Sequence, residues 1–148
     1  MKCLFCGKIK SAVFFVVALL AAYFINVEVQ SYFGRQALAG TGLESVAFED
    51  ALAKAGNDGK LVLVDVSAIW CSTCRKLDNT VFSDDSVKAA INEKYVFSRI
   101  EYESEEGQRF LERYNASGFP TLFVIRPDGS IVRRLKVTFS PEEFRSQL

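Results

Sequence analysis

Cys71 and Cys74 are the residues of this 148-residue chain whose types and spacing best suit chemistry. They lie in the stretch Ile69-Trp70-Cys71-Ser72-Thr73-Cys74, directly after the apolar run 61–66. If a helix begins at or just after Cys71, the two side chains share one helical face, and a disulfide closes and reopens with little backbone movement. The spacing therefore predicts a redox-active dithiol at a strand-to-helix junction.

The two thiols should have different roles. The first turn of a helix has unpaired N–H groups and the positive end of the helix dipole, and both stabilise an anion. We therefore expect the pKa of the Cys71 thiol to lie below that of a free thiol, as in other C-x-x-C motifs at helix starts. Cys71 is the predicted nucleophile, and Cys74, one turn deeper, is the predicted resolving thiol.

A zinc site and a pair of inert core cysteines are the alternatives for this motif. Structural zinc takes four nitrogen or sulfur ligands, and the chain has no histidine. Only Cys3 and Cys6 would complete such a site, and a long apolar segment separates them from Cys71. We expect these two to be reduced, idle thiols, with acylation or a metal contact as alternatives. No metal or cofactor is expected besides the Cys71–Cys74 disulfide.

Asp65 is the only carboxyl in the run 61–66, which is continuously apolar otherwise, as in strands covered on both faces. Burial raises the pKa of a carboxyl by desolvation. Asp65 is therefore a candidate proton acceptor for Cys74 during exchange. The alternative is that Asp65 only hydrogen-bonds a neighbouring backbone group.

A second motif, Gly118-Phe119-Pro120-Thr121, occurs about forty-five residues later. Together with Val64-Asp65-x-x-x-x-Trp70-Cys71-x-x-Cys74-Arg75, it makes the chain resemble thioredoxin over about residues 43–148. The segment Asn79–Asp84 is most similar to the thioredoxin-like domains of membrane-anchored, extracytoplasmic disulfide reductases.

This resemblance implies an α/β thioredoxin fold, with a central mixed sheet of about four to five strands flanked by helices. It implies that the Phe119–Pro120 bond is cis and faces the dithiol, so that the Phe119 backbone pairs with an extended substrate strand; a trans proline capping a strand is the alternative. Asp65 has the proton-transfer role in that family, and Arg99 falls near a lysine that faces it. Trp70 shields the dithiol and binds partner proteins, or only packs.

The surrounding sequence supplies elements that would position these residues. Thr41-x-x-Glu44 resembles a capping box before a helix with Phe48, Ala51, Leu52 and Ala55 on one face. The remaining expected elements are a helix capped by Ser83 or Asp84, a strand at 95–100 parallel to 61–66, a helix capped by Ser104, a hairpin of 121–125 with 131–137, and a short helix after Ser140.

Composition favours one compact domain with an appendage. Apolar residues make up 49% of the chain and charged residues 24%, which excludes a disordered class. The formal net charge is zero, so the sequence gives no sign of nucleic-acid binding.

The appendage is an apolar segment near the N-terminus. Lys10 and Glu28 bracket about seventeen uncharged residues, the lower limit for a membrane-spanning helix. Lysines precede the segment, which places the N-terminus in the cytoplasm. We expect a cytoplasmic N-terminus at 1–10, a single transmembrane anchor at 11–29, a linker at 30–42 and a periplasmic thioredoxin-like domain at 43–148. Cleavage of a signal peptide after Ala39 is the alternative, although such peptides are usually shorter.

The sequence thus predicts an inner-membrane thiol–disulfide oxidoreductase that acts on protein disulfides outside the cytoplasm, and the resemblance favours the reducing direction. Electrons would come from a membrane protein, because the chain has no flavin or nicotinamide motif. Three alternatives remain: a disulfide-donating oxidase or isomerase using the same residues, a non-catalytic binding module using the Pro120 edge, and a metallochaperone.

Overall fold

The computed structural model describes the backbone of residues 4–148 and the side chains from Lys10 onward. The predictions for Cys3 and for the side chain of Cys6 lie outside the described residues.

A four-stranded mixed sheet forms the centre of the domain, in the order β2-β1-β3-β4. Strand β1 (Leu61–Ser67) pairs in parallel with β2 (Tyr95–Glu101) and antiparallel with β3 (Thr121–Ile125), which pairs antiparallel with β4 (Ile131–Leu135). The predicted parallel pair, the predicted hairpin and the expected thioredoxin-like sheet are therefore confirmed. The hairpin's second strand ends at Leu135 rather than Val137.

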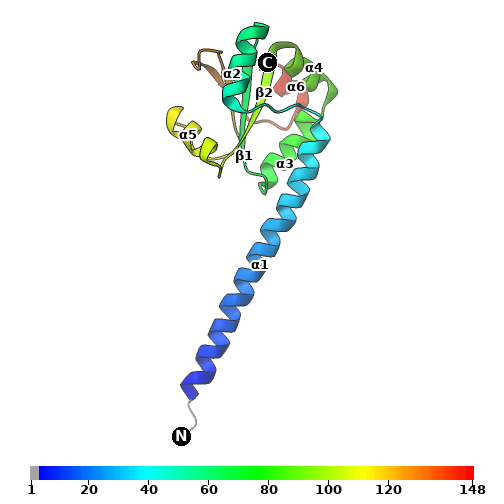
Figure 1. Ribbon diagram of the computed structural model, residues 1–148. Coiled ribbons are helices and arrows are strands. Elements are labelled where there is room, and N and C mark those ends of the chain that lie inside the picture. Colours follow the sequence, from blue (N-terminus) through cyan, green and yellow to red (C-terminus); the bar gives the residue numbers. More distant parts are fainter. Residues whose placement is uncertain (1–3) are drawn as a thin grey trace.

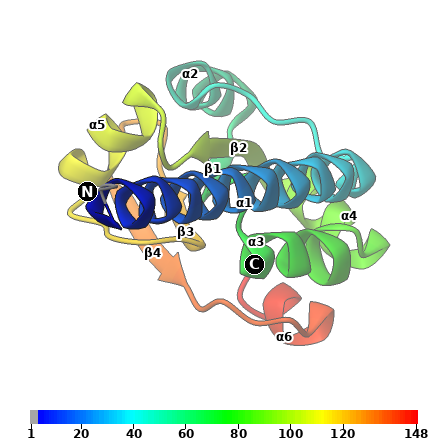
Figure 2. The same cartoon turned by 90° about the horizontal axis from the view of Figure 1, so that it is seen from below.

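Helices cover both faces of this sheet, as Figure 2 shows. One face packs against α2 (Phe48–Asp58) and α5 (Glu105–Arg113), and the other against α3 (Ser72–Leu77), the π-helix η1 (Asp78–Phe82), α4 (Asp85–Lys94) and α6 (Pro141–Arg145). The alternation of β1 divides its side chains between two cores: Val62, Val64 and Val66 face α2 and α5, whereas Leu63 faces α4 and η1. Asp65 follows Leu63 by two residues, so its side chain lies on the same face of the sheet as that of Leu63.

Three predicted helix starts are confirmed by their capping contacts. Asp84 Oδ1 accepts the N–H groups of Ser86 and Val87, Ser104 Oγ accepts that of Gly107, and Ser140 Oγ accepts that of Glu143. Short as it is, α6 covers the sheet with a fully buried Phe144, whose ring lies 5.6 Å from that of Phe82.

The predicted capping box at Thr41 is wrong. Helix α2 begins at Phe48 after Ala47, which makes no side-chain capping bond. Instead the Glu106 carboxylate, from the first turn of α5, accepts the N–H of Phe48 at 3.0 Å. Thr41 has a different role at the end of α1, where its hydroxyl donates to the Leu38 carbonyl and accepts the N–H of Leu43. A distant carboxylate thus replaces the local cap.

Helix α1 (Leu4–Thr41) extends far from the domain and joins it at its C-terminal end (Figure 1). Its large apolar side chains from Val13 to Ile25 are each 53–70% exposed. By length and composition, the stretch Lys10–Thr41 is able to cross a membrane, with a mean hydropathy of 2.2 in its most apolar window. A cleavable signal sequence has the same properties, so the helix is a candidate membrane span.

The expected linker at 30–42 is helical instead of an extended tether. Residues 30–41 continue α1 without a break, and the chain leaves the helix at Gly42, which has a φ of 66°. The glycines at positions 34 and 40 led to the wrong prediction, because glycine weakens a helix but does not end it when neighbouring elements pack against it. The burial of Ser31, Ala37 and Thr41 shows that this part of α1 packs on the domain.

Candidate active site

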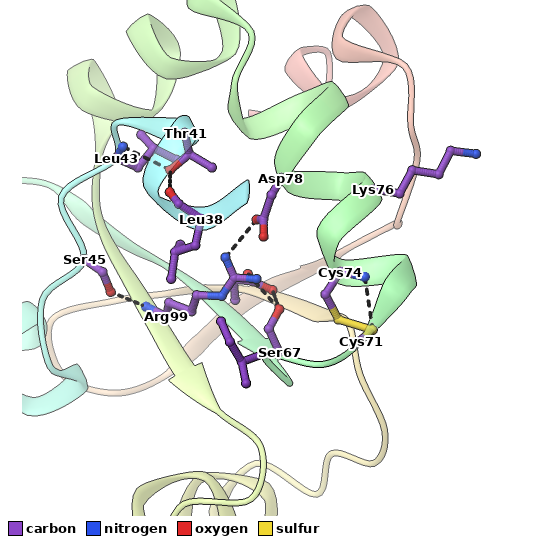
Figure 3. Close-up of polar contacts among 12 residues, drawn as sticks. Leu38, Thr41, Leu43, Ser45, Ser67, Cys71, Cys74, Lys76, Asp78 and Arg99 are labelled. Carbon is purple, nitrogen blue, oxygen red and sulfur yellow. Dashed lines mark hydrogen bonds and ion pairs between the residues drawn. A yellow bond between two sulfur atoms is a disulfide. The ribbon is translucent and has the colours of Figure 1, made fainter. Parts of the chain in front are cut away.

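Cys71 occupies the N-cap position of α3, and it forms a disulfide with Cys74. The Cα atoms of the two residues lie 5.3 Å apart. The Cys71 sulfur also accepts the N–H of Cys74 at 3.0 Å (Figure 3). The predicted strand-to-helix junction is therefore present, and a backbone N–H of the first helical turn points at the sulfur that was expected to carry a negative charge.

The two sulfurs differ in access. Cys71 is 7% exposed and borders an open cleft of about 440 Å³, whereas Cys74 is 1% exposed and does not line it. Residues from three parts of the chain line this cleft: Asn26, Val27, Gln30, Trp70, Cys71, Ser72, Thr73 and Phe119. A substrate sulfur entering the cleft meets Cys71 first.

The Phe119–Pro120 peptide bond is cis, as expected. Phe119 lies beside the dithiol in a small cluster with Trp70 and Tyr102. Its ring is 5.3 Å from that of Trp70 and 4.6 Å from that of Tyr102, both in edge-to-face arrangements. The structure thus brings Phe119 together with Trp70 and the disulfide, which the sequence placed in two separate motifs.

A buried ionic cluster lies on the same side of the sheet. Asp65 is fully buried and accepts bonds from the Ser67 hydroxyl at 2.9 Å. Arg99, on the neighbouring strand, places one guanidinium nitrogen 3.4 Å from Asp65 and another 2.8 Å from Asp78 (Figure 3). The predicted pairing of Arg99 with Asp65 is confirmed, but the second carboxylate, Asp78, was not predicted.

Burial sets the protonation behaviour of this cluster. Desolvation raises the pKa of Asp65, and the repulsion of Asp78 raises it further, against the lowering effects of Arg99 and Ser67. Desolvation also raises the pKa of Asp78, although its bond to Arg99 opposes this. Two carboxylates therefore share one guanidinium in a buried site, which favours proton uptake by one of them.

Two acidic residues beside the active-site loop were missed as site residues. The acidic run that begins at the last residue of β2 is typical of a solvated loop, yet the Glu101 carboxylate accepts the N–H of Ile69 at 3.2 Å and Glu103 accepts the indole N–H of Trp70 at 3.2 Å. The parallel pairing of β1 and β2 was the available signal, because it places the last residues of the two strands, and those that follow them, at one edge of the sheet.

No cluster of three or more histidine, cysteine or acidic side chains suited to a metal ion occurs among the residues whose side chains are described. The chemistry that this arrangement supports is exchange at the disulfide.

Comparisons with known proteins agree with this geometry. A family model described as thioredoxin-like matches residues 43–127. The thiol:disulfide interchange protein DsbD of Pseudomonas fluorescens is 32% identical over 91 residues, which is 61% of this chain and 16% of that protein. DsbD 1 of Pseudomonas aeruginosa is 37% identical over 89 residues, covering 59% and 15%. The chain thus spans about a sixth of the length of these curated relatives.

Solved structures show the same fold. A thioredoxin from Thermus thermophilus superposes with a TM-score of 0.64 and 27% identity, covering 71% of this chain and 83% of that one. The oxidised C-terminal domain of Neisseria meningitidis DsbD gives a TM-score of 0.56 and 26% identity, covering 70% and 96%.

The chain belongs to the thioredoxin-like family, whose model covers more than half of it. Within that family it carries a disulfide between Cys71 and Cys74 in a C-x-x-C motif, and it is similar to DsbD over about 90 residues.

Proposed function

We propose that the chain is a membrane-anchored reductase of protein disulfides outside the cytoplasm. The observation that supports this most directly is the asymmetry of the dithiol: Cys71 borders the cleft and accepts a helix N–H, while Cys74 lies buried behind it. An accessible, anion-stabilised sulfur suits the attacking role, and a buried neighbour suits resolution.

The reaction begins with both cysteines reduced. The Cys71 thiolate attacks one sulfur of a substrate disulfide, forming a mixed disulfide and releasing the other substrate sulfur as a thiolate. Cys74 loses its proton and attacks the Cys71 sulfur. The second substrate thiolate leaves, and the enzyme holds the Cys71–Cys74 disulfide seen in the structure. Two electrons have then moved from the enzyme dithiol to the substrate.

Asp65 accepts the proton of Cys74 in this proposal. Its burial and its raised pKa suit a group that must take up a proton and release it again during exchange. Trp70 and Phe119 contact the substrate beside Cys71, and the Phe119 backbone before Pro120 pairs with an extended substrate segment.

Helix α1 supplies the membrane anchor. Its exposed apolar length would be unfavourable in water, and lysines at its N-terminal side favour the orientation with the domain outside the cytoplasm. Turnover requires a dithiol donor that returns two electrons to Cys71–Cys74, and a membrane protein fits that role. Similarity to DsbD supports thiol–disulfide interchange, and the resemblance of residues 79–84 to extracytoplasmic reductases favours the reducing direction.

Insulin reduction by the full chain in detergent micelles, with dithiothreitol as donor, tests the activity. We expect Cys71→Ser to abolish it. Equal rates for the two proteins would instead support a binding module. The reduction potential of the pair tests the direction: a value near about −270 mV fits a reductase, and a value near about −120 mV fits an oxidase.

A further inference from the structure

The C-terminal part of α1 carries a regular stripe that packs on the active-site region. Buried or half-buried residues recur every three or four positions: Val27, Gln30, Ser31, Gly34, Ala37, Leu38 and Thr41. This is the spacing of one helical face. The stripe contains mostly small side chains, which lets the backbone of α1 approach that of the active-site region closely. The helix is therefore docked along α3 and η1 over several turns.

Gly34 marks the closest approach. A Cβ built at this position would lie 1.8 Å from the carbonyl oxygen of Ile69, a backbone atom of the active-site loop. A side chain at position 34 is therefore incompatible with the present position of α1. By contrast, a Cβ at Gly40, on the same helix, would meet nothing within 4 Å.

Polar and aromatic contacts hold the same region. The Gln30 side-chain carbonyl accepts a bond from the Arg75 guanidinium at 2.6 Å, and the Arg75 guanidinium also lies 5.7 Å from the centre of the Phe33 ring. Arg75 is the residue directly after Cys74 in α3. The anchor helix is thus bonded to the helix that carries the dithiol.

The next turn of α1 toward the N-terminus borders the cleft itself. Asn26, Val27 and Gln30 line the same 440 Å³ space as Cys71 and Phe119. From there α1 continues beyond the domain (Figure 1) and carries its exposed apolar segment. A partner that reaches Cys71 through this cleft must enter a space lined by both α1 and the aromatic side chains of Trp70 and Phe119, which suits an extended segment better than a broad folded surface.

We infer that the end of α1 is a wall of the substrate-binding cleft, in which Asn26, Val27 and Gln30 contact an extended polypeptide segment and select it against folded surfaces. This inference rests on the proposed function, because it assigns a substrate class to the same dithiol. The two amide side chains are suited to bond a peptide backbone, and Val27 offers it an apolar contact. The cleft begins next to the exposed apolar side chains of Val13 to Ile25, so the substrate segment is bound close to the membrane surface.

Photocrosslinking on a trapped intermediate tests this contact. The full chain with Cys74→Ala, Cys3→Ser and Cys6→Ser, in micelles, reacts with a peptide whose single cysteine carries a 5-thio-2-nitrobenzoate group. Attack by Cys71 attaches the peptide and releases the coloured thiolate, which counts the mixed disulfide. p-Benzoylphenylalanine replaces Val27 or, as a matched control, Val29, which is 45% exposed and does not line the cleft. After illumination the disulfide is reduced, and the remaining crosslink is measured.

We expect the crosslink yield at position 27 to exceed that at position 29 several-fold. Equal yields from equal amounts of mixed disulfide would overturn the inference and leave the proposed function intact. Absence of coloured thiolate would overturn both.

A second variant with a small substitution tests the same contact, because the bulky p-benzoylphenylalanine could itself disturb the cleft. With Cys74 present, Asn26→Ala should lower kcat/KM for the reduction of a peptide disulfide several-fold more than that for hydroxyethyl disulfide. No change with the peptide would contradict the inference, and so would an equal loss with both disulfides, since a cleft wall should affect the larger substrate more.

Discussion

Arg99 donates to Asp78 at 2.8 Å while its other terminal nitrogen lies 3.4 Å from Asp65. One guanidinium therefore contacts two carboxyls on different elements, a strand and a π-helix. A lysine ammonium is a single point charge and lacks the planar fork that spans two acceptors.

Removing this shared charge should be costly. Arg99→Met leaves Asp65 and Asp78 buried without a counter-charge, and breaking a buried pair in this way costs roughly 3–5 kcal/mol of unfolding free energy. Urea denaturation at pH 7 measures the loss. Arg109→Met, which breaks an exposed ion pair with Glu105, is the control and should change stability little. Similar losses for both variants would contradict the importance of the buried cluster.

Neutralising Asp65 should stabilise the domain at neutral pH. Its folded-state pKa is raised above its ordinary value of 3.8, so the folded state binds more protons than the unfolded state between that value and the folded-state pKa. Stability therefore falls as pH rises through this range. Asp65→Asn removes this loss, and its advantage in urea midpoint should grow from pH 4 to pH 7. An advantage that is constant with pH would contradict this account.

The same variant should be slower in catalysis. Asn cannot accept the proton of Cys74, so the second step of exchange loses its base, a loss of roughly 10²-fold or more in rate. Stopped-flow decay of the mixed disulfide measures this step. The first step, attack by Cys71, should be nearly unchanged. A more stable protein with an undiminished second step would limit Asp65 to a structural role.

Access to the two sulfurs predicts which one reacts. In the reduced protein at pH 6, iodoacetamide should modify Cys71 much faster than Cys74, because Cys71 borders the cleft and accepts the Cys74 N–H. The pKa of Cys71, measured by thiolate absorbance, should lie below that of a free thiol. Preferential modification of Cys74, or an ordinary Cys71 pKa, would reverse the assigned roles.

Gly34 should control the docking of α1. Gly34→Ala forces α1 away from the Ile69 carbonyl, and such overpacking costs about 1–3 kcal/mol. Hydrogen exchange at Ile69 and in residues 30–41 should increase. Gly40→Ala, which meets no neighbour, should leave exchange there unchanged or slower, since alanine favours the helix. The docked helix would be refuted by equal exchange in the two variants.

The disulfide and the cis proline bond beside it were predictable from sequence because their signals are local. Cys71 and Cys74 are three residues apart, and the Phe119–Pro120 motif is a short pattern whose cis bond the family resemblance implied. The burial of Asp65 was expected from its apolar neighbours.

The contacts around the disulfide were not predictable in the same way. Glu103 meets Trp70 across 33 positions, and Gln30 meets Arg75 across 45. Such pairs depend on how strands and helices are arranged in space, which short patterns do not encode. The docked face of α1 was hidden for another reason: it consists of small and polar residues such as Gly34 and Ser31, which resemble a tether when only apolar periodicity is considered.

Because α1 runs into the domain without a break, it fixes both the distance and the orientation of the domain relative to the apolar segment. Each residue inserted into a helix adds about 1.5 Å of length and rotates the rest of the chain by about 100°. One extra residue between Ile25 and Gln30 would therefore rotate the entrance of the cleft about the axis of α1 and also move it farther from the apolar segment. The distance and the orientation of the cleft therefore change together, whereas a flexible linker would leave the orientation free.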